Sequence, residues 1–338
     1  MNKNNQKIHN LNGINRILII RLSSLGDVLL ATPLIRILKN NFPGIEIGFV
    51  TKSQYADGLK LNPHINRLFL FEPQDEKIPN LIEELKKQSY DLVIDLQNNL
   101  RSKKITDSLD IKTVRFYKHS FDKFLLVNFK INRLKNTPPI PERYLLTIPG
   151  LKPDGAGLEL YTKGEPSFLL KGKTNLIGIA PGSKHFTKRW PKEYFEYLGK
   201  LLIKTGYQVV LFGGKDDITI CAEISERIEN SINLCNNDDL LQTAADIKEC
   251  LAFVCNDSGL MHAACAVKVP VLALFGSTVK EFGFIPYKNS NLILENNSLT
   301  CRPCSHIGRK RCPRGHFRCM LDLSPEKTFQ VLMTLIES

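Results

Sequence analysis

The stretch Arg16-Ile-Leu-Ile-Ile-Arg-Leu-Ser-Ser-Leu-Gly-Asp27 decides the fold of this 338-residue chain. Its apolar first half predicts a buried strand over residues 16–21, and the apolar periodicity of residues 28–38 predicts a helix. Two serines, a glycine and one acid lie between these elements. In open α/β sheets such a strand-to-helix turn lies at the carboxyl ends of the strands, where ligands bind. Asp27 is therefore predicted to be an acid at the mouth of a cleft.

The same alternation of apolar strands and amphipathic helices continues along the chain. Strands are predicted at residues 46–51, 67–71, 92–96, 113–117, 176–180, 208–212, 251–255 and 271–275, and helices at 192–204, 218–229 and 240–248 in the second half. This alternation is typical of βαβ units and parallel sheets. A Pro- and Gly-rich stretch interrupts it between residues 137 and 172. The pattern predicts an α/β protein with two doubly wound, Rossmann-like domains that face a central cleft.

The domain boundaries follow from the same pattern. The first domain is predicted to span residues 14–165 and the second residues 172–322, with a last helix over residues 324–338 that Ser324 caps. The polar leader, residues 1–13, lies outside this pattern, and we expect it to be disordered.

Composition restricts the class of protein. The hydrophobic content of 43% and charged content of 24% are typical of a globular protein. No run approaches the roughly 18 apolar residues of a membrane span, and the leader lacks the apolar centre of a signal peptide. We therefore expect a cytoplasmic protein.

The net charge of +12 is unevenly distributed. Residues 101–135 contain ten Lys/Arg against three Asp, and residues 302–318 contain six Lys/Arg and no acid. Such patches favour anionic partners such as a phosphorylated substrate or an anionic membrane, although each can also be a solvated basic face. No zinc-finger, homeodomain or RNP-type pattern accompanies the charge, so we expect no nucleic acid partner.

Three glycine turns follow strands of the second half. They contain Pro181-Gly-Ser183, Gly213-Gly214 and Asp257-Ser-Gly259, the last at the start of a predicted helix. Free backbone amides at such turns and helix starts favour phosphate groups, so the three together favour a nucleotide site. Plainer interpretations also exist. The turn at residues 181–183 can be an ordinary tight turn, Asp257 can serve only as a helix cap, and His262 in the following helix can be a core residue. Trp190 is equally compatible with a core position.

Nine cysteines in an apparently cytosolic chain argue against a disulfide framework. Five of them (Cys221, Cys235, Cys250, Cys255 and Cys265) have the apolar or helical surroundings of small core residues. The others loosely fit the spacing of a structural zinc site, with five candidate ligands for four positions: Cys301, Cys304, Cys312, His316 and Cys319. The alternative is a reduced, cysteine-rich loop, and neither interpretation assigns catalysis to the segment.

Together these motifs resemble the lipopolysaccharide heptosyltransferase family, glycosyltransferase family 9. The resemblance covers nearly the whole chain from Arg16, and its marks stand in a specific order: residues 21–33, 95–97, 181–183, 188–191, 257–262, 275–276 and the cysteine segment. It implies the GT-B fold, in which the final helix commonly returns to the first domain. The first domain would then bind the acceptor and the second the nucleotide sugar.

The resemblance also implies roles for individual residues. Asp27 takes the place of the general base, and the first turn near the reacting centre contains Ser23, Ser24 and Gly26. Lys188 matches the phosphate-contacting lysine, with Ser183 and Thr187 beside it. Asp257, Ser258, Gly259 and His262 match the turn that binds diphosphate and sugar. The chemistry requires no cofactor, and no Asp-x-Asp metal motif is found.

The sequence thus predicts an inverting, metal-independent transferase that moves heptose from ADP-heptose to an anionic lipopolysaccharide inner-core acceptor. It would act at the inner face of the bacterial inner membrane through peripheral contact with anionic lipid. Three alternatives remain: a related transferase that uses another nucleotide sugar, a GT-B-type nucleotide-sugar epimerase, and a basic scaffold that binds polyanions without catalysis.

Overall fold

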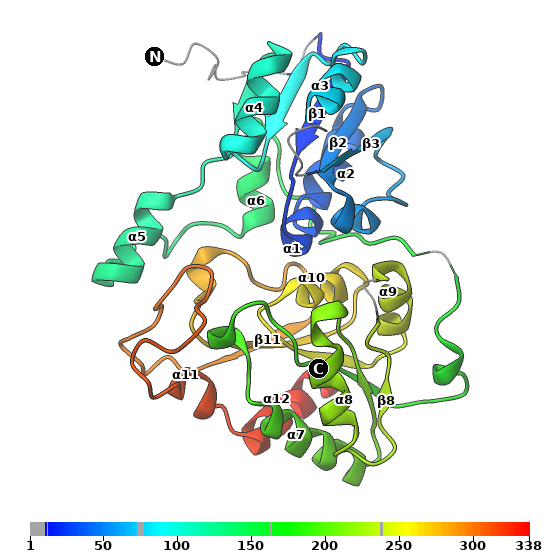
Figure 1. Ribbon diagram of the computed structural model, residues 1–338, viewed down its shortest axis with the longest axis vertical. Helices are drawn as coiled ribbons and strands as arrows, with labels where there is room; N and C mark the ends of the chain where they lie inside the picture. Colours follow the sequence, from blue (N-terminus) through cyan, green and yellow to red (C-terminus); the bar gives the residue numbers. More distant parts are fainter. Residues whose placement is uncertain (1–10, 12, 73–77, 163, 237–238) are drawn as a thin grey trace. The chain divides into compact units, whose positions relative to one another are not determined.

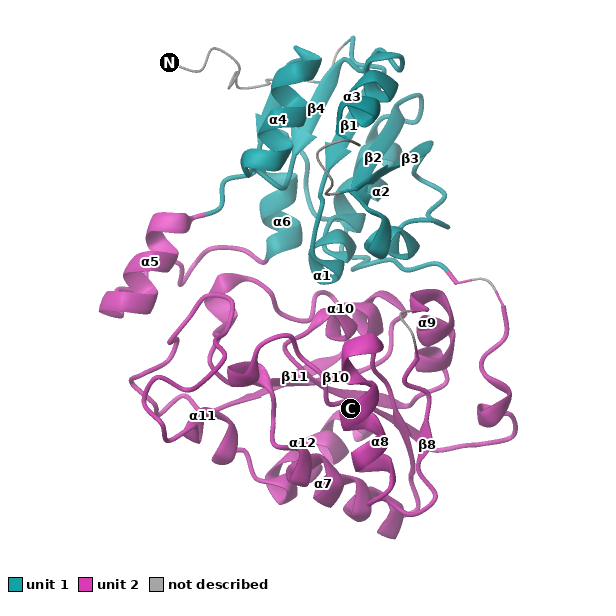
Figure 2. Ribbon diagram, in the orientation of Figure 1, with its two compact units in different colours: residues 1–118, 140–161 teal, residues 119–139, 162–338 magenta. Residues whose placement is uncertain are grey.

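The computed structural model describes residues 11, 13–72, 78–162, 164–236 and 239–338. These residues divide into two compact units, which Figure 2 colours separately. Unit 1 contains the chain up to Lys118 together with Ile140–Tyr161, and unit 2 contains His119–Pro139 and Thr162–Ser338. Nearly all of the leader predicted to be disordered lies outside the described residues.

Unit 1 is built around a five-stranded parallel sheet with the order β3-β2-β1-β4-β5 (Figure 1). The strands are β1 (Arg16–Ile20), β2 (Glu46–Lys52), β3 (Arg67–Phe71), β4 (Leu92–Asp95) and β5 (Thr113–Arg115). The helices are α1 (Leu25–Leu29), α2 (Thr32–Asn41), α3 (Ile78–Lys86), α4 (Leu100–Leu109) and α6 (Ile140–Leu145). The strand order reverses direction between β1 and β4, which makes that edge the switch point where doubly wound sheets bind ligands.

Unit 2 has a six-stranded parallel sheet with the order β11-β10-β9-β6-β7-β8. Its strands are β6 (Leu176–Ala180), β7 (Gln208–Leu211), β8 (Ile232–Asn233), β9 (Ala252–Asn256), β10 (Val271–Phe275) and β11 (Asn291–Glu295). Its helices are α5 (Ser120–Phe129), α7 (Lys192–Lys204), α8 (Ile218–Ser225), α9 (Leu240–Lys248), α10 (Gly259–Ala266), α11 (Arg318–Leu321) and α12 (Pro325–Glu337). The switch point of this sheet lies between β6 and β9.

Each unit has its own apolar core. Leu18, Ile20 and Val93 belong to the core on one face of the first sheet, and Ile177, Leu211 and Val254 belong to the core of the second. The central strands β4, β6 and β9 are buried along their whole length, as parallel strands covered on both faces must be. The prediction of two doubly wound α/β domains is confirmed.

The helix predicted at residues 28–38 is wrong as one element. The structure breaks it into α1 and α2, with Pro33 near the start of α2. A proline ring clashes with the carbonyl group four residues earlier, here that of Leu29, so a continuous helix cannot pass through it. As a result α1 begins at Leu25 and Asp27 lies inside this short helix.

The last helix is also placed differently from the prediction. Ser324 caps α12 as predicted, accepting a hydrogen bond from the Lys327 amide at 3.3 Å. The helix packs within unit 2, however, where Leu332 and Leu335 join the core of the second sheet. The expected return to the first domain is therefore wrong: the apolar face of α12 is already covered by α7 and the β9–β11 strands. Conversely, α5 belongs to unit 2 although the chain before and after it belongs to unit 1 (Figure 2).

Candidate functional site

The first candidate site lies at the switch point of unit 1, where α1 follows β1. The Asp27 carboxylate is held from two sides: Oδ2 accepts hydrogen bonds from the amide and hydroxyl of Ser24, each at 2.9 Å, and Oδ1 forms an ion pair with Arg21. Only 14% of the Asp27 side chain is exposed. Arg21 donates to the Leu96 carbonyl at 2.7 Å and lies over the Tyr144 ring, so its own position is fixed by neighbouring elements.

This environment keeps Asp27 ionised. Burial alone would raise the pKa of its carboxyl group, but the charge of Arg21 and the hydrogen bonds from Ser24 outweigh burial and hold the pKa below its ordinary value. An ionised, positioned carboxylate at a switch point can accept a proton from a bound hydroxyl group.

The end of β4 organises this turn from the other side. Gln97 Oε1 accepts hydrogen bonds from the amides of Leu22 and Ser23 at 2.9 and 3.1 Å. Ser23 is therefore fixed through its backbone, while the Ser24 side chain is exposed and Gly26 is buried. Asp95 is fully buried and accepts from the Ser102 hydroxyl at 2.9 Å. The motif at residues 95–97 was visible in the sequence, but its function as the support of the first turn was not.

The second candidate site lies at the switch point of unit 2, where loops follow β6 and β9. Lys188 Nζ forms an ion pair with Asp257 Oδ2 at 2.7 Å, and the same oxygen accepts a hydrogen bond from Thr278 at 2.7 Å. The Ser183 hydroxyl donates to the Asp257 carbonyl at 3.4 Å. The structure thus brings Asp257 to Ser183 and Lys188, which lie about 70 residues earlier in the sequence, and the resemblance placed all three at the donor site.

An asparagine that the sequence did not single out joins the two loops. Asn256, at the end of β9, donates to the Pro181 carbonyl at 2.7 Å and accepts from the Trp190 amide at 3.0 Å. Trp190 is a core residue, 1% exposed, whose indole donates to the Leu323 carbonyl at 2.8 Å. The buried side-chain amide of Asn256 therefore fixes the chain at both Pro181 and Trp190. In the sequence, the one indication of this role was the position of Asn256 directly before Asp257.

Thr187 does not face solvent at this site. It is 1% exposed, and its hydroxyl accepts a hydrogen bond from the Arg309 amide at 2.8 Å. Its backbone amide donates to the Arg309 carbonyl at 3.1 Å. These contacts fasten the turn to the segment near the C-terminus, so Thr187 has a structural position rather than one from which its hydroxyl can reach a ligand.

The remaining predicted donor residues lie on α10. Ser258 is its N-cap residue and Gly259 its first residue, and both are partly exposed. His262 lies one turn further and is buried, 4% exposed. The free amides at the start of α10, next to Lys188 and Asp257, form an electropositive end that suits an anionic group.

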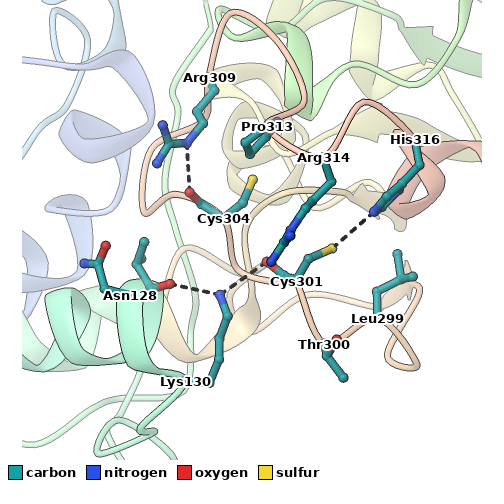
Figure 3. Close-up of a pocket in the computed structure, with 11 residues that line it drawn as sticks. Asn128, Lys130, Leu299, Thr300, Cys301, Cys304, Arg309, Pro313, Arg314 and His316 are labelled. Atoms are coloured by element: carbon teal, nitrogen blue, oxygen red, sulfur yellow. Dashed lines mark hydrogen bonds between the residues drawn. The ribbon is translucent and has the colours of Figure 1, made fainter.

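The cysteine segment lines a pocket of about 590 Å³ in unit 2 (Figure 3). His316 Nδ1 accepts a hydrogen bond from the Arg318 amide, so Nε2 carries the proton and points at Cys301 Sγ, 3.8 Å away. Cys319 is buried in the core of the second sheet. Among the described residues no three His, Cys, Asp or Glu side chains are placed to hold a metal ion, and zinc binding by Cys301, Cys304, Cys312, His316 and Cys319 stays a prediction.

All nine cysteines are free thiols. Cys221, Cys250, Cys255 and Cys265 are buried, as expected of small core residues, whereas Cys235 is partly exposed. No helix in the described part of the chain is long and apolar enough to cross a membrane.

Comparison with known proteins identifies the family that this chain matches. The model of glycosyltransferase family 9 (heptosyltransferase) matches residues 78–313. The chain is similar to lipooligosaccharide heptosyltransferase 2 of Haemophilus influenzae, with 28% identity over 95% of this chain and 99% of that protein.

Two solved structures are also similar. That of Escherichia coli ADP-heptose lipopolysaccharide heptosyltransferase II has 25% sequence identity and a TM-score of 0.74, over 95% of this chain and 98% of that one. A family 9 glycosyl transferase from Veillonella parvula has 24% identity and a TM-score of 0.79, over 96% of this chain and 98% of that one, and supports the fold.

Proposed function

The chain belongs to glycosyltransferase family 9 (heptosyltransferase), and on this premise we propose that it transfers heptose from ADP-heptose to a lipopolysaccharide inner-core acceptor with inversion at the anomeric carbon. The observation that carries the proposal is the ionised Asp27 carboxylate, fixed by Arg21 and Ser24 at the switch point of unit 1. A family 9 transferase needs one such base and one electropositive site for the leaving diphosphate.

Asp27 acts as the general base in this proposal. The acceptor hydroxyl oxygen forms a bond to the anomeric carbon of heptose, the bond from that carbon to the diphosphate oxygen breaks, and the hydroxyl proton moves to Asp27. The exposed Ser24 hydroxyl now donates to Asp27 Oδ2, and an acceptor hydroxyl would take its place as the donor. The second oxygen stays in the ion pair with Arg21, which keeps the carboxylate oriented.

The ADP group binds in this proposal at the switch point of unit 2. Lys188, the Ser183 hydroxyl and the amides at the start of α10 supply positive charge and donors to its phosphate oxygens. Lys188 is now neutralised by Asp257, so the diphosphate has to compete with that carboxylate for the ammonium group. Thr278 continues to satisfy Asp257 when Lys188 turns to the phosphate.

We further propose that the transfer needs no metal cofactor, because Lys188 and the α10 amides already supply the charge that a leaving diphosphate requires. The acceptor is anchored in a lipid bilayer, and the protein carries strongly basic segments. We therefore place the enzyme on the inner face of the bacterial inner membrane as a peripheral protein.

The deciding experiment measures ADP release from ADP-heptose with and without a deacylated lipopolysaccharide core acceptor. Acceptor-dependent release is expected for the natural protein and is lost in Asp27→Asn, whereas the affinity for ADP-heptose changes little. Asp91→Asn is the matched control, since its carboxylate accepts from the Asn15 and Arg16 amides at the opposite end of the sheet. Release without acceptor, or a donor affinity that falls in parallel with the rate, would contradict the proposed role of Asp27.

A further inference from the structure

Helix α5 presents an aromatic face to solvent. Its opposite face is packed in unit 2, where Leu126 joins Leu134 and Phe282 in a small apolar cluster. Phe121, Phe124 and Phe129 are nevertheless 60%, 52% and 62% exposed. Phe124 and Phe129 contact each other edge to face, with ring centroids 5.8 Å apart, and neither is buried by the core. Three exposed phenylalanines on a ten-residue helix form an apolar patch that the core does not explain.

The segment after α5 continues this patch with apolar and basic side chains. Ile131 is 49% exposed, and Arg133 and Lys135 are exposed as well. Lys130 has a different function, because its ammonium group donates to the carbonyl groups of Cys301 and Pro303 at 3.2 and 2.6 Å. Lys130 therefore fastens the end of α5 to the cysteine segment, as Figure 3 shows.

This connection brings parts of two basic segments to one pocket. Val127, Asn128 and Lys130 from α5 and its end line the same pocket as Arg309 and Arg314. Residues 302–318 contain six Lys/Arg and no acid, and Lys310, Arg311 and Arg314 among them are exposed. The two regions are about 170 residues apart in the sequence, yet they line one pocket, and the exposed phenylalanines belong to the same helix as Val127 and Asn128.

We propose that the exposed face of α5 and the basic segment 302–318 form a docking surface for an anionic phospholipid bilayer. The phenylalanine rings enter the boundary between headgroups and acyl chains, while the arginine and lysine side chains contact lipid phosphates. The inference rests on the proposed function, whose acceptor is lipid-anchored, and names the residues by which the enzyme reaches the membrane.

The charge of the surface favours a bilayer over a second copy of this chain. In a two-fold dimer the same patch of each copy faces the other, so this pairing would bring two strongly basic segments together. An anionic bilayer offers apolar depth for the rings and opposite charge for the cations at the same time.

Vesicle co-sedimentation with the full chain tests the proposal. We expect binding to vesicles that contain phosphatidylglycerol, little binding to pure phosphatidylcholine, and weaker binding at high salt. The variant Phe121→Ser/Phe124→Ser is expected to bind at least about tenfold more weakly, because two rings no longer enter the bilayer. Its matched control is Phe168→Ser/Leu169→Ser, which removes two apolar side chains, 81% and 56% exposed, from another part of unit 2.

A charge variant tests the basic segment separately. Arg311→Glu/Arg314→Glu is expected to weaken binding at least about tenfold, since each cation near an anionic surface contributes about 1 kcal/mol. Lys171→Glu/Lys173→Glu is the matched control, because both lysines are exposed and lie outside this surface. The proposal would be overturned if the variants bound anionic vesicles as strongly as their controls do, or if the natural protein did not bind these vesicles.

Two further readouts separate the possible failures. Suppose that the natural protein binds no vesicles and yet forms larger particles in solution than Phe121→Ser/Phe124→Ser does. That result would assign the aromatic face to self-association and overturn the bilayer proposal. ADP release with the deacylated acceptor in solution needs no bilayer and is measured on the same natural protein. Release without vesicle binding refutes the docking surface alone, whereas vesicle binding without release refutes the proposed transfer.

Discussion

Arg21 is the residue whose importance the sequence did not reveal. Read along the chain, it is a charge at the end of a strand, next to the serines and Asp27. In the fold it is buried and makes contacts with three separate elements: Asp27 in α1, Leu96 after β4 and Tyr144 in α6. Such a role depends on non-local contacts, and periodicity in the sequence contains no information about those.

The pH dependence of transfer tests the function of Arg21. Because its guanidinium group lowers the pKa of Asp27, the carboxylate stays ionised at neutral pH, and kcat/KM should fall only at acid pH as the carboxylate is protonated. Arg21→Gln removes that charge and leaves burial to raise the pKa of Asp27, so the acid limb should move to higher pH. Arg16→Gln, which removes an exposed arginine from the same strand, should leave the limb in place. A lower rate with an unmoved acid limb would show that Arg21 acts only through structure.

Lys188 gives the corresponding prediction for the donor. We expect Lys188→Ala to raise the KM for ADP-heptose roughly tenfold or more, because a charge-assisted bond to phosphate contributes about 1.5–3 kcal/mol. Lys184→Ala removes an exposed lysine from the same turn and should change the KM little. Steady-state kinetics at saturating acceptor measures both KM values. Equal KM values for the two variants would contradict a contact between Lys188 and the phosphate.

At the scale of elements, local pattern predicted the buried strands well and the interruptions poorly. The strands Leu176–Ala180 and Val271–Phe275 begin and end where the apolar runs do. The edge strands Ile232–Asn233 and Asn291–Glu295 were missed, because partly exposed strands lack a continuous apolar run. The turns were predicted without the side chains that pack against them. The turn at Gly182 was predicted to bind phosphate, yet in the fold a carboxylate lies against this glycine.

That carboxylate leads to a prediction about the turn after β6. A Cβ atom on Gly182 would overlap the Asp217 carboxylate, which also accepts a hydrogen bond from the Gly214 amide at 3.2 Å. We expect Gly182→Ala to destabilise the protein by about 1–3 kcal/mol and to lower the Tm. Gly44→Ala is the matched control, since open space surrounds that position. In Gly182→Ala/Asp217→Ala the overlap is absent, so the double variant should lose less than the two single changes together; strict additivity would contradict this explanation.

At the scale of the whole molecule, two doubly wound units with separate cores give the GT-B fold that the resemblance implied. The motifs predicted the position of each site at a switch point, because parallel strands bring their carboxyl ends to one edge. They did not predict how the chain is divided between the units. The segment His119–Pro139 belongs to unit 2 because Leu126 and Leu134 pack on Phe282, a contact between residues about 150 positions apart. Pairings of that kind are decided by shape and packing rather than by local pattern.

The metal dependence of the whole enzyme distinguishes a metal needed for transfer from a metal that only stabilises the fold. If Lys188 and the amides of α10 stabilise the leaving diphosphate, protein treated with a chelator and freed of divalent cations should release ADP at an unchanged rate. If the cysteine segment binds zinc, metal analysis of the purified protein should find one equivalent, and chelation should lower the Tm without altering that rate. Cys301→Ser should reproduce the lower Tm, whereas Cys235→Ser, a partly exposed cysteine outside the segment, should not. Loss of ADP release on chelation, with recovery on addition of Mg²⁺, would instead mean that the positive charge at the diphosphate comes from a metal and that the protein groups at the β6–β9 switch point are insufficient by themselves.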